Sequence, residues 1–299
     1  MRSGGQWAVL AALLAGVVFA WPTYVRYFGL HPGPMLLALS IAFVMYLPSL
    51  WAIRYVDRDE PEPPLLFWCS IAFVILFAPI TSRVMHTIID AGLLRYWIVV
   101  GPLEELTKLL PLLLVARFIP SAVNSMRDCI VYGALGGLGF AIVEFGANFA
   151  VSGFATEGWS YLRTAVPARW ALGTDSHIIW GATAGVGVGY LLSQRRLGWN
   201  VLLGLGIVAL VMATHGFNDL YGKYIGPLAM VLLLEPAQAA DIDLTTLGDD
   251  TPLAAALLVY SVVANTLVMN LLLWPVLAWG IAYSGGPERT ADATLGKSA

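Results

Sequence analysis

Long apolar runs dominate this chain and constrain its fold more than any other feature. Runs of about 20 residues, the length needed to cross the hydrocarbon core of a bilayer, recur along most of the sequence. Within lipid, every backbone N–H and C=O group must find its partner inside the protein, so such runs fold as transmembrane helices. The sequence therefore predicts an all-α fold, a polytopic transmembrane helix bundle.

About eight to nine spans are expected, because an apolar run of this length makes one crossing. The run 225–238 is short, so it either spans the membrane or re-enters it. The last run is longer than one straight crossing requires, and we expect Pro275 to kink it. The spans are expected near residues 6–24, 34–53, 64–83, 94–116, 129–151, 170–193, 200–218, 225–238 and 253–283.

Composition supports one integral membrane domain and excludes several classes of protein. The chain is 59% hydrophobic and 12% charged, with a net charge of −3. It has no basic stripe, so no nucleic-acid partner is expected. We assign residues 1–283 to a single membrane domain, with a motif-bearing core at about 54–220, and residues 284–299 to a flexible polar tail. The mixed charge and proline of residues 57–64 predict a stiff, extended connector between two spans.

Five ionisable side chains lie inside the predicted spans and mark a candidate site. They are Glu104, Glu105, Glu144, His177 and His215. A charged group at membrane depth costs a few kcal/mol unless it is paired, protonated or bound, so such residues indicate function by default. With these span boundaries, the side chains from all four spans lie in the same half of the membrane. We therefore expect them to form one cluster.

The spacing of neighbouring polar residues suggests how two of the acidic residues are held. Glu104 and Lys108 are four residues apart and share a helix face, so we expect an ion pair between them. Glu105 points about 100° away, toward a different neighbour. Asn148 shares a face with Glu144 and is expected to fix its rotamer. The alternative for the Glu–Lys pair is a salt bridge that only fixes helix packing.

The two intramembrane histidines have different surroundings in the sequence. His177 begins a glycine-rich span, where the alternative to a functional role is a hydrogen-bonded packing residue. His215 has Asp219 one helical turn further on, where a carboxylate orients an imidazole as a supporting partner. On the helix of Glu144, the glycines of GALGGLGF are interpreted as small residues that allow close helix packing.

Taken in order, these motifs resemble those of a known family. EELTK at 104–108, FAIVE at 140–144, the lone His177 and HGFND at 215–219 lie on separate spans. This pattern resembles the PrsW family of intramembrane proteases, distant relatives of the type II CAAX prenyl proteases. The prenyl proteases differ at the positions of Lys108, Glu144 and Asp219. The resemblance implies cleavage of membrane-tethered, anti-sigma-factor-like proteins near the outer surface, by an enzyme in the bacterial cytoplasmic membrane.

Two hydrolytic mechanisms fit these residues, and the sequence leaves both open. In the first, Glu144, His177 and His215 ligate Zn²⁺ or another divalent metal while Glu104 acts as the base. In the second, no metal is needed, and Glu104 activates water with help from Glu144 while His215 and Asp219 stabilise the oxyanion. The alternatives to this protease are a proton-coupled membrane transporter and a CAAX-type prenyl-protein endopeptidase. The expected partners are a membrane-anchored protein substrate and the lipid bilayer, and the oligomeric state stays open.

Overall fold

All regular structure is helical in the part of the chain that the computed structural model describes. Those residues are Trp7, 11–20, Pro22, Val25, 32–88, 99–148, 176–193, 199–221 and 252–284. No β-strand occurs among them, which confirms the all-α prediction. The run 225–238 and the tail beyond Ser284 lie outside the described residues.

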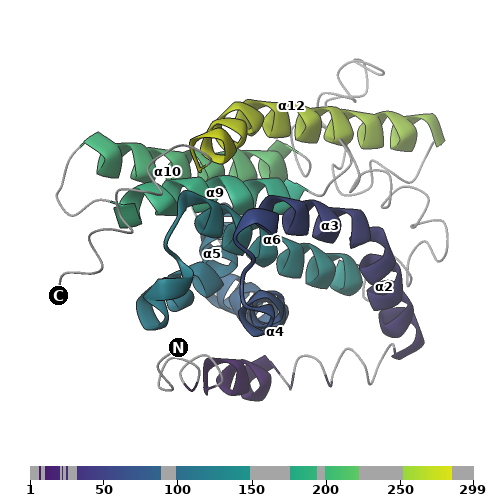
Figure 1. Ribbon diagram of the computed structural model, residues 1–299. Helices are drawn as coiled ribbons and strands as arrows, with labels where there is room; N and C mark the ends of the chain where they lie inside the picture. Colours follow the sequence, from purple (N-terminus) through teal and green to yellow (C-terminus); the bar gives the residue numbers. More distant parts are fainter. Residues whose placement is uncertain are drawn as a thin grey trace, which may run out of the picture.

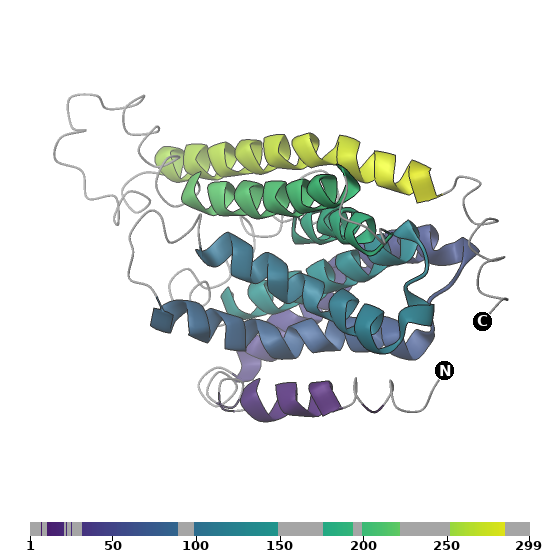
Figure 2. The same ribbon diagram turned by 90° about the vertical axis from the view of Figure 1, so that its left-hand side faces the viewer.

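Figures 1 and 2 show long helices packed side by side as a bundle. α12 lies along one side of this bundle, next to α10 and α9, whereas α4 lies on the opposite side (Figure 1). In chain order the labelled helices are α2 (Pro32–Met45), α3 (Leu47–Val56), α4 (Pro64–Ile88), α5 (Gly101–Phe118), α6 (Met126–Asn148), α9 (Ser176–Ser193), α10 (Trp199–Leu220) and α12 (Pro252–Ser284).

Membrane crossing is supported for part of the predicted set of spans. By length and apolar composition, α4, α6, α10 and α12 are long enough to cross a bilayer. The bent pair α2 and α3 would make a fifth span. The expected number of eight to nine spans is therefore not established within the described residues. α5 falls outside the set because its 18 residues include four charged side chains.

The span expected at 34–53 is not one straight helix. α2 ends at Met45, α3 begins at Leu47, and the apolar segments on either side of this break meet at an angle of 43°. Pro48 lies in the first turn of α3. It has no N–H to donate to the carbonyl group four residues earlier, so the helical hydrogen bonding is interrupted at this point. Sequence length alone indicated a single crossing and missed this break.

Close backbone contact between α6 and α9 forms the centre of the bundle. The two helices run in opposite directions, and a Cβ atom built on Gly133 would overlap the carbonyl group of Gly181. A Cβ atom on Gly137 would likewise overlap the carbonyl group of His177. The glycines of α6 therefore serve close packing, as the sequence predicted. The same contact places the first turn of α9 beside the second half of α6.

The acidic connector before α4 is folded against the start of α6. Its first residues form a short 3-10 turn, η1 (Asp57–Asp59), instead of the extended chain expected from sequence. The Tyr132 hydroxyl donates a hydrogen bond to Glu62 Oε2 at 2.7 Å, and Asp57 Oδ1 accepts the Glu62 N–H at 3.0 Å. Burial raises the pKa of Glu62 to about 8. These contacts join the connector to the helix that carries Glu144.

Candidate active site

The first turns of α5 are held directly against α10. A Cβ atom built on Gly101 would lie 2.7 Å from both the Gly216 nitrogen and the Met212 carbonyl oxygen, so only glycine permits this approach. Glu104 and Glu105 follow one turn later on α5, whereas His215 lies beside Gly216 on α10. The close contact of the two backbones therefore brings two carboxylates to one imidazole.

Glu105 forms the buried ion pair that the sequence assigned to Glu104. Its Oε1 lies 2.5 Å from Lys108 Nζ, and both side chains are fully buried. The same oxygen lies 2.6 Å from His215 Nδ1. The predicted Glu104–Lys108 pair is wrong because residues three and four apart both share a helix face. Glu105 forms the pair because of the position of His215: one Glu105 oxygen can then bond to both Lys108 and His215.

His177 is held through both of its ring nitrogens. Lys108 Nζ lies 2.8 Å from His177 Nδ1, and Glu144 Oε2 contacts His177 Nε2. Lysine in its charged form is only a donor, so the Nδ1 atom accepts this hydrogen bond and Nε2 carries the proton. Lys108 thus joins the carboxylate that orients His215 to the other histidine. Glu144 is about one-third exposed, the most open carboxylate among the site residues.

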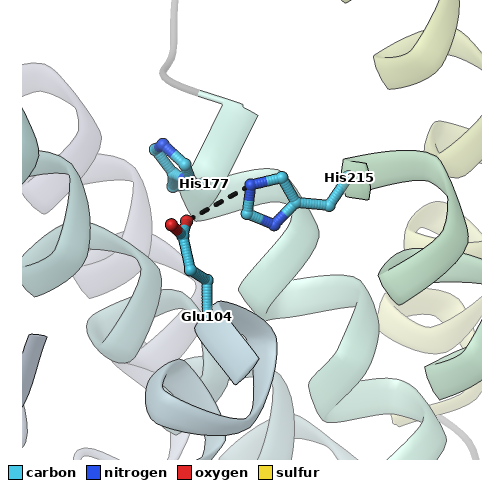
Figure 3. A group of neighbouring side chains, drawn as sticks. All are labelled: Glu104, His177 and His215. Atoms are coloured by element: carbon cyan, nitrogen blue, oxygen red, sulfur yellow. Dashed lines mark ion pairs between the residues drawn. The ribbon is translucent and has the colours of Figure 1, made fainter. Parts of the chain in front are cut away.

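One oxygen of Glu104 and one nitrogen from each histidine lie close together. The three atoms all lie within 4.8 Å of one another (Figure 3). Glu104 Oε2 lies 3.4 Å from His215 Nε2, the interaction drawn as a dashed line. Asp219 Oδ2 lies 3.5 Å from the same nitrogen. Of the residues expected to cluster, Glu104, His177 and His215 are therefore brought together from three helices.

The sequence predicted that Asp219 alone orients the His215 ring, whereas in the structure both Glu105 and Asp219 lie beside that ring. Glu105 binds His215 at Nδ1, whereas Asp219 faces Nε2, the nitrogen that also faces Glu104. Glu105 accepts a hydrogen bond from the Nδ1–H group of His215. The neutral ring therefore has its lone pair on Nε2, and this lone pair points into the cluster. The side chain of Asn148, expected beside Glu144, lies outside the described residues.

Aromatic rings enclose the polar cluster, and sequence reasoning did not identify most of them. The Trp180 ring lies 4.4 Å from the His215 ring, centroid to centroid, and Phe140 lies 5.1 Å from His177. Trp180 is 1% exposed and is one helical turn beyond His177 on α9. That spacing is the signal that could have identified it. The rings exclude water from Lys108, which lies 4.8 Å from the Phe140 ring.

The side chains of the cluster are of the types that hydrolytic sites use. The cluster combines two imidazoles with four carboxylates, those of Glu104, Glu105, Glu144 and Asp219, inside an apolar bundle. Two histidines and one carboxylate are a donor set that catalytic zinc sites use, and a further carboxylate beside them can act as an acid or a base. Among the described residues, this is the group of histidine and acidic side chains close enough to hold a metal ion.

In a comparison with protein families, residues 65–239 match the PrsW family intramembrane metalloprotease. The matched region covers more than half of the chain and includes every residue of the cluster. The chain therefore belongs to the PrsW family and is an integral membrane protein of a protease family. Neither the curated proteins nor the solved structures that were compared with the chain gave a match.

Proposed function

We propose that this chain hydrolyses peptide bonds of membrane-tethered proteins at a site formed by Glu104, Glu105, Glu144, His177 and His215. The observation that carries the proposal is the meeting of one Glu104 oxygen with both histidines within 4.8 Å. Those groups come from three different helices and lie inside an apolar bundle. Ionisable groups are costly at membrane depth, so their assembly there marks a functional site by default.

A divalent metal fits this donor set. We propose that Glu104, His177 and His215 hold the ion, Zn²⁺ being the best match to two imidazoles and a carboxylate. Glu105 on His215 Nδ1 is the supporting carboxylate that metal-binding histidines normally have. When bound, the metal would supply a Lewis acid that polarises the scissile carbonyl group and lowers the pKa of water.

This proposal exchanges the roles that the sequence suggested for two glutamates. Glu104 lies with the histidines, whereas Glu144 is outside the group of close donor atoms and is more exposed. Glu144 therefore takes the proton of the attacking water and passes it to the leaving nitrogen of the substrate. In the structure, without a metal, its contact with His177 Nε2 places the carboxylate beside the cluster.

Lys108 keeps the cluster ordered without contacting substrate. It is fully buried and lies between Glu105 and the Nδ1 atom of His177. In the structure Nε2 of His177 carries a proton, so holding a metal at that nitrogen would require the proton and the hydrogen bond from Lys108 to Nδ1 to be given up. Lys108 still keeps Glu105 as its partner in that arrangement.

The substrate class comes from the family resemblance. We propose a single-span, anti-sigma-factor-like protein in the bacterial cytoplasmic membrane, cut as part of regulated intramembrane proteolysis. The motif-bearing core that acts on it lies within a single domain, residues 1–283. The site is at one end of the helices, near the start of α5 and α9, which agrees with cleavage close to a membrane surface.

Conservative substitutions of the two glutamates test the assignment. Purified Glu104→Gln and Glu144→Gln proteins are compared for bound zinc and for cleavage of a single-span substrate in liposomes. We expect Glu104→Gln to lose metal and activity. Glu144→Gln keeps its metal but cleaves about 100-fold or more slowly, as expected for loss of a general base. The exposed Glu60→Gln protein is the matched control and retains both properties.

The opposite pattern would contradict the assignment. If Glu144→Gln lost the metal while Glu104→Gln retained it, Glu144 would be the ligand and Glu104 the base. If the wild-type protein cleaved no membrane-tethered substrate while remaining folded, the proposed function itself would be wrong.

A further inference from the structure

An apolar groove lies between α3 and α12, with α6 and α9 as its floor. Its volume is about 140 Å³. Figure 1 shows α3 beside α6 and α12 beside α9. The lining includes Ala52 on α3, Ala134 on α6, Ala182 on α9, and Trp274 and Leu277 on α12. Ala52 and Trp274 are exposed, so the groove can be entered from the side of the bundle.

One end of the groove lies at the turn of α9 that carries His177. Ile178, which lines it, is the residue that follows His177 on α9. From there the lining residues of α9 and α12 run toward the other end of the bundle, as far as Ala182 and Ile281. A helix seated in the groove would therefore have one end at the level of the first turn of α9, which carries His177.

The composition of the groove suits a helix. Three of its lining residues are alanines, one each from α3, α6 and α9. Small residues let helix backbones approach closely in membranes, where van der Waals packing drives association. An acyl chain has no need of such a surface. The occupant favoured by these residues is therefore a transmembrane helix.

A buried polar group lies on α12 one turn beyond the groove, toward the site. Asn270 is four residues before Trp274 and shares its helix face. Its side chain is fully buried, and its Nδ2 atom donates a hydrogen bond to Ser176 Oγ at 3.2 Å. Its Oδ1 atom has no hydrogen-bond partner among the described residues. An unsatisfied buried acceptor costs about 1–3 kcal/mol, so this oxygen is available to a donor.

We propose that the groove seats the transmembrane helix of the substrate and that Asn270 Oδ1 accepts a backbone N–H from the substrate where that helix unwinds. A peptidase cuts extended chain, and unwinding a helix in lipid frees N–H groups that must find new acceptors. Because Asn270 is buried in the free protein, substrate binding has to shift α12 locally at this level. The inference rests on the proposed protease function and adds the binding mode of its substrate.

Filling the groove from its exposed edge tests this directly. Ala52→Trp is compared with Ala209→Trp, an exposed alanine on α10 that does not line the groove. The measurement is kcat/KM for a single-span substrate divided by kcat/KM for a short peptide with the same cleavage sequence. We expect Ala52→Trp to lower this ratio about tenfold or more, which corresponds to loss of about 1.4 kcal/mol of docking energy. Ala209→Trp keeps the wild-type ratio.

An unchanged ratio in Ala52→Trp would overturn the groove proposal and leave the protease function intact. This is the result expected if lipid, and not the substrate helix, fills the groove. If the wild-type protein cleaved neither substrate, both proposals would be wrong.

Crosslinking gives an independent test of docking, in a Glu104→Gln background without Cys69 and Cys129. Ala52→Cys is expected to form disulfides with cysteines along one face of the substrate helix. Equal crosslinking by Ala209→Cys would contradict specific docking.

A comparison with Ser176, the hydrogen-bond partner of Asn270, tests whether Asn270 binds substrate or only holds α9 in place. Asn270→Leu removes the free acceptor and the bond to Ser176, whereas Ser176→Ala removes only that bond. We expect Asn270→Leu to reduce cleavage of the single-span substrate far more than Ser176→Ala does. Equal losses would show that Asn270 acts only by fixing α9.

Discussion

The Glu105 carboxylate lies 2.6 Å from Nδ1 of His215, a residue 110 positions further along the chain. This contact joins α5 to α10 in the interior of the bundle, where neither side chain is more than 1% exposed. The oxygen that accepts from His215 also accepts from Lys108 at 2.5 Å. One carboxylate oxygen thus holds the two basic groups that organise the cluster.

Removing only one residue of this buried ion pair is expected to lower the free energy of unfolding more than removing both residues does. Lys108→Met leaves the Glu105 carboxylate buried without its cation, a change of about 3–5 kcal/mol in the free energy of unfolding. Glu105→Gln leaves Lys108 in the equivalent state. The double variant should be less destabilised than the sum of the two single variants, because neither charge remains. Thermal unfolding in detergent measures all three.

The more exposed pair between Arg127 and Asp59 is the control for this comparison. Its nitrogen and oxygen lie 2.5 Å apart, but Asp59 is 47% exposed. Arg127→Met is expected to change the free energy of unfolding by about 1 kcal/mol or less. Strictly additive losses at Glu105 and Lys108 would contradict the buried pairing described here.

Much of the architecture could be predicted from the sequence because it depends on local properties. Apolar length predicted the helices, and the glycines predicted the close approach of α6 and α9. The identity of the ion pair could not be predicted. Glu104 and Glu105 are both within reach of Lys108, and only the position of His215 on another helix decides between them. Asn270 was missed for the same reason, since its partner Ser176 lies 94 residues earlier.

Gly137 is expected to be essential for placing His177. A methyl group there would overlap the His177 carbonyl group, so Gly137→Ala has to push α9 away from α6. We expect lower thermal stability and loss of substrate cleavage. Gly206 on α10 is exposed, and a Cβ atom there meets nothing within 4 Å. Gly206→Ala is therefore the matched control, and it should raise stability slightly or leave it unchanged. Equal effects of the two changes would contradict the close packing at Gly137.

Stability should depend on pH through Glu62. Burial raises its pKa to about 8, so the folded protein holds this proton at pH values where the unfolded chain has lost it. The contribution of Glu62 is therefore full below its ordinary pKa range, and it is lost as pH rises through about 8. Glu62→Gln stays neutral and can still accept the Tyr132 hydroxyl.

The difference between wild type and Glu62→Gln is measured by thermal unfolding between about pH 5 and pH 9. We expect the unfolding midpoint of the wild-type protein to fall over this range by more than that of the variant. Glu60→Gln, an exposed neighbour, should keep the wild-type dependence. Parallel curves for wild type and Glu62→Gln would show that Glu62 is already charged in the folded protein at neutral pH.

The central claim is that Glu104, His177 and His215 hold a metal ion on which proteolysis depends. The most direct test is the rate at which purified protein cleaves a single-span substrate after treatment with a chelator and again after addition of zinc. We expect chelation to abolish cleavage by the wild-type protein and zinc to restore it. His215→Ala should gain no activity from zinc. Full cleavage by folded, metal-free wild-type protein would contradict the claim and favour a mechanism in which glutamate alone activates water.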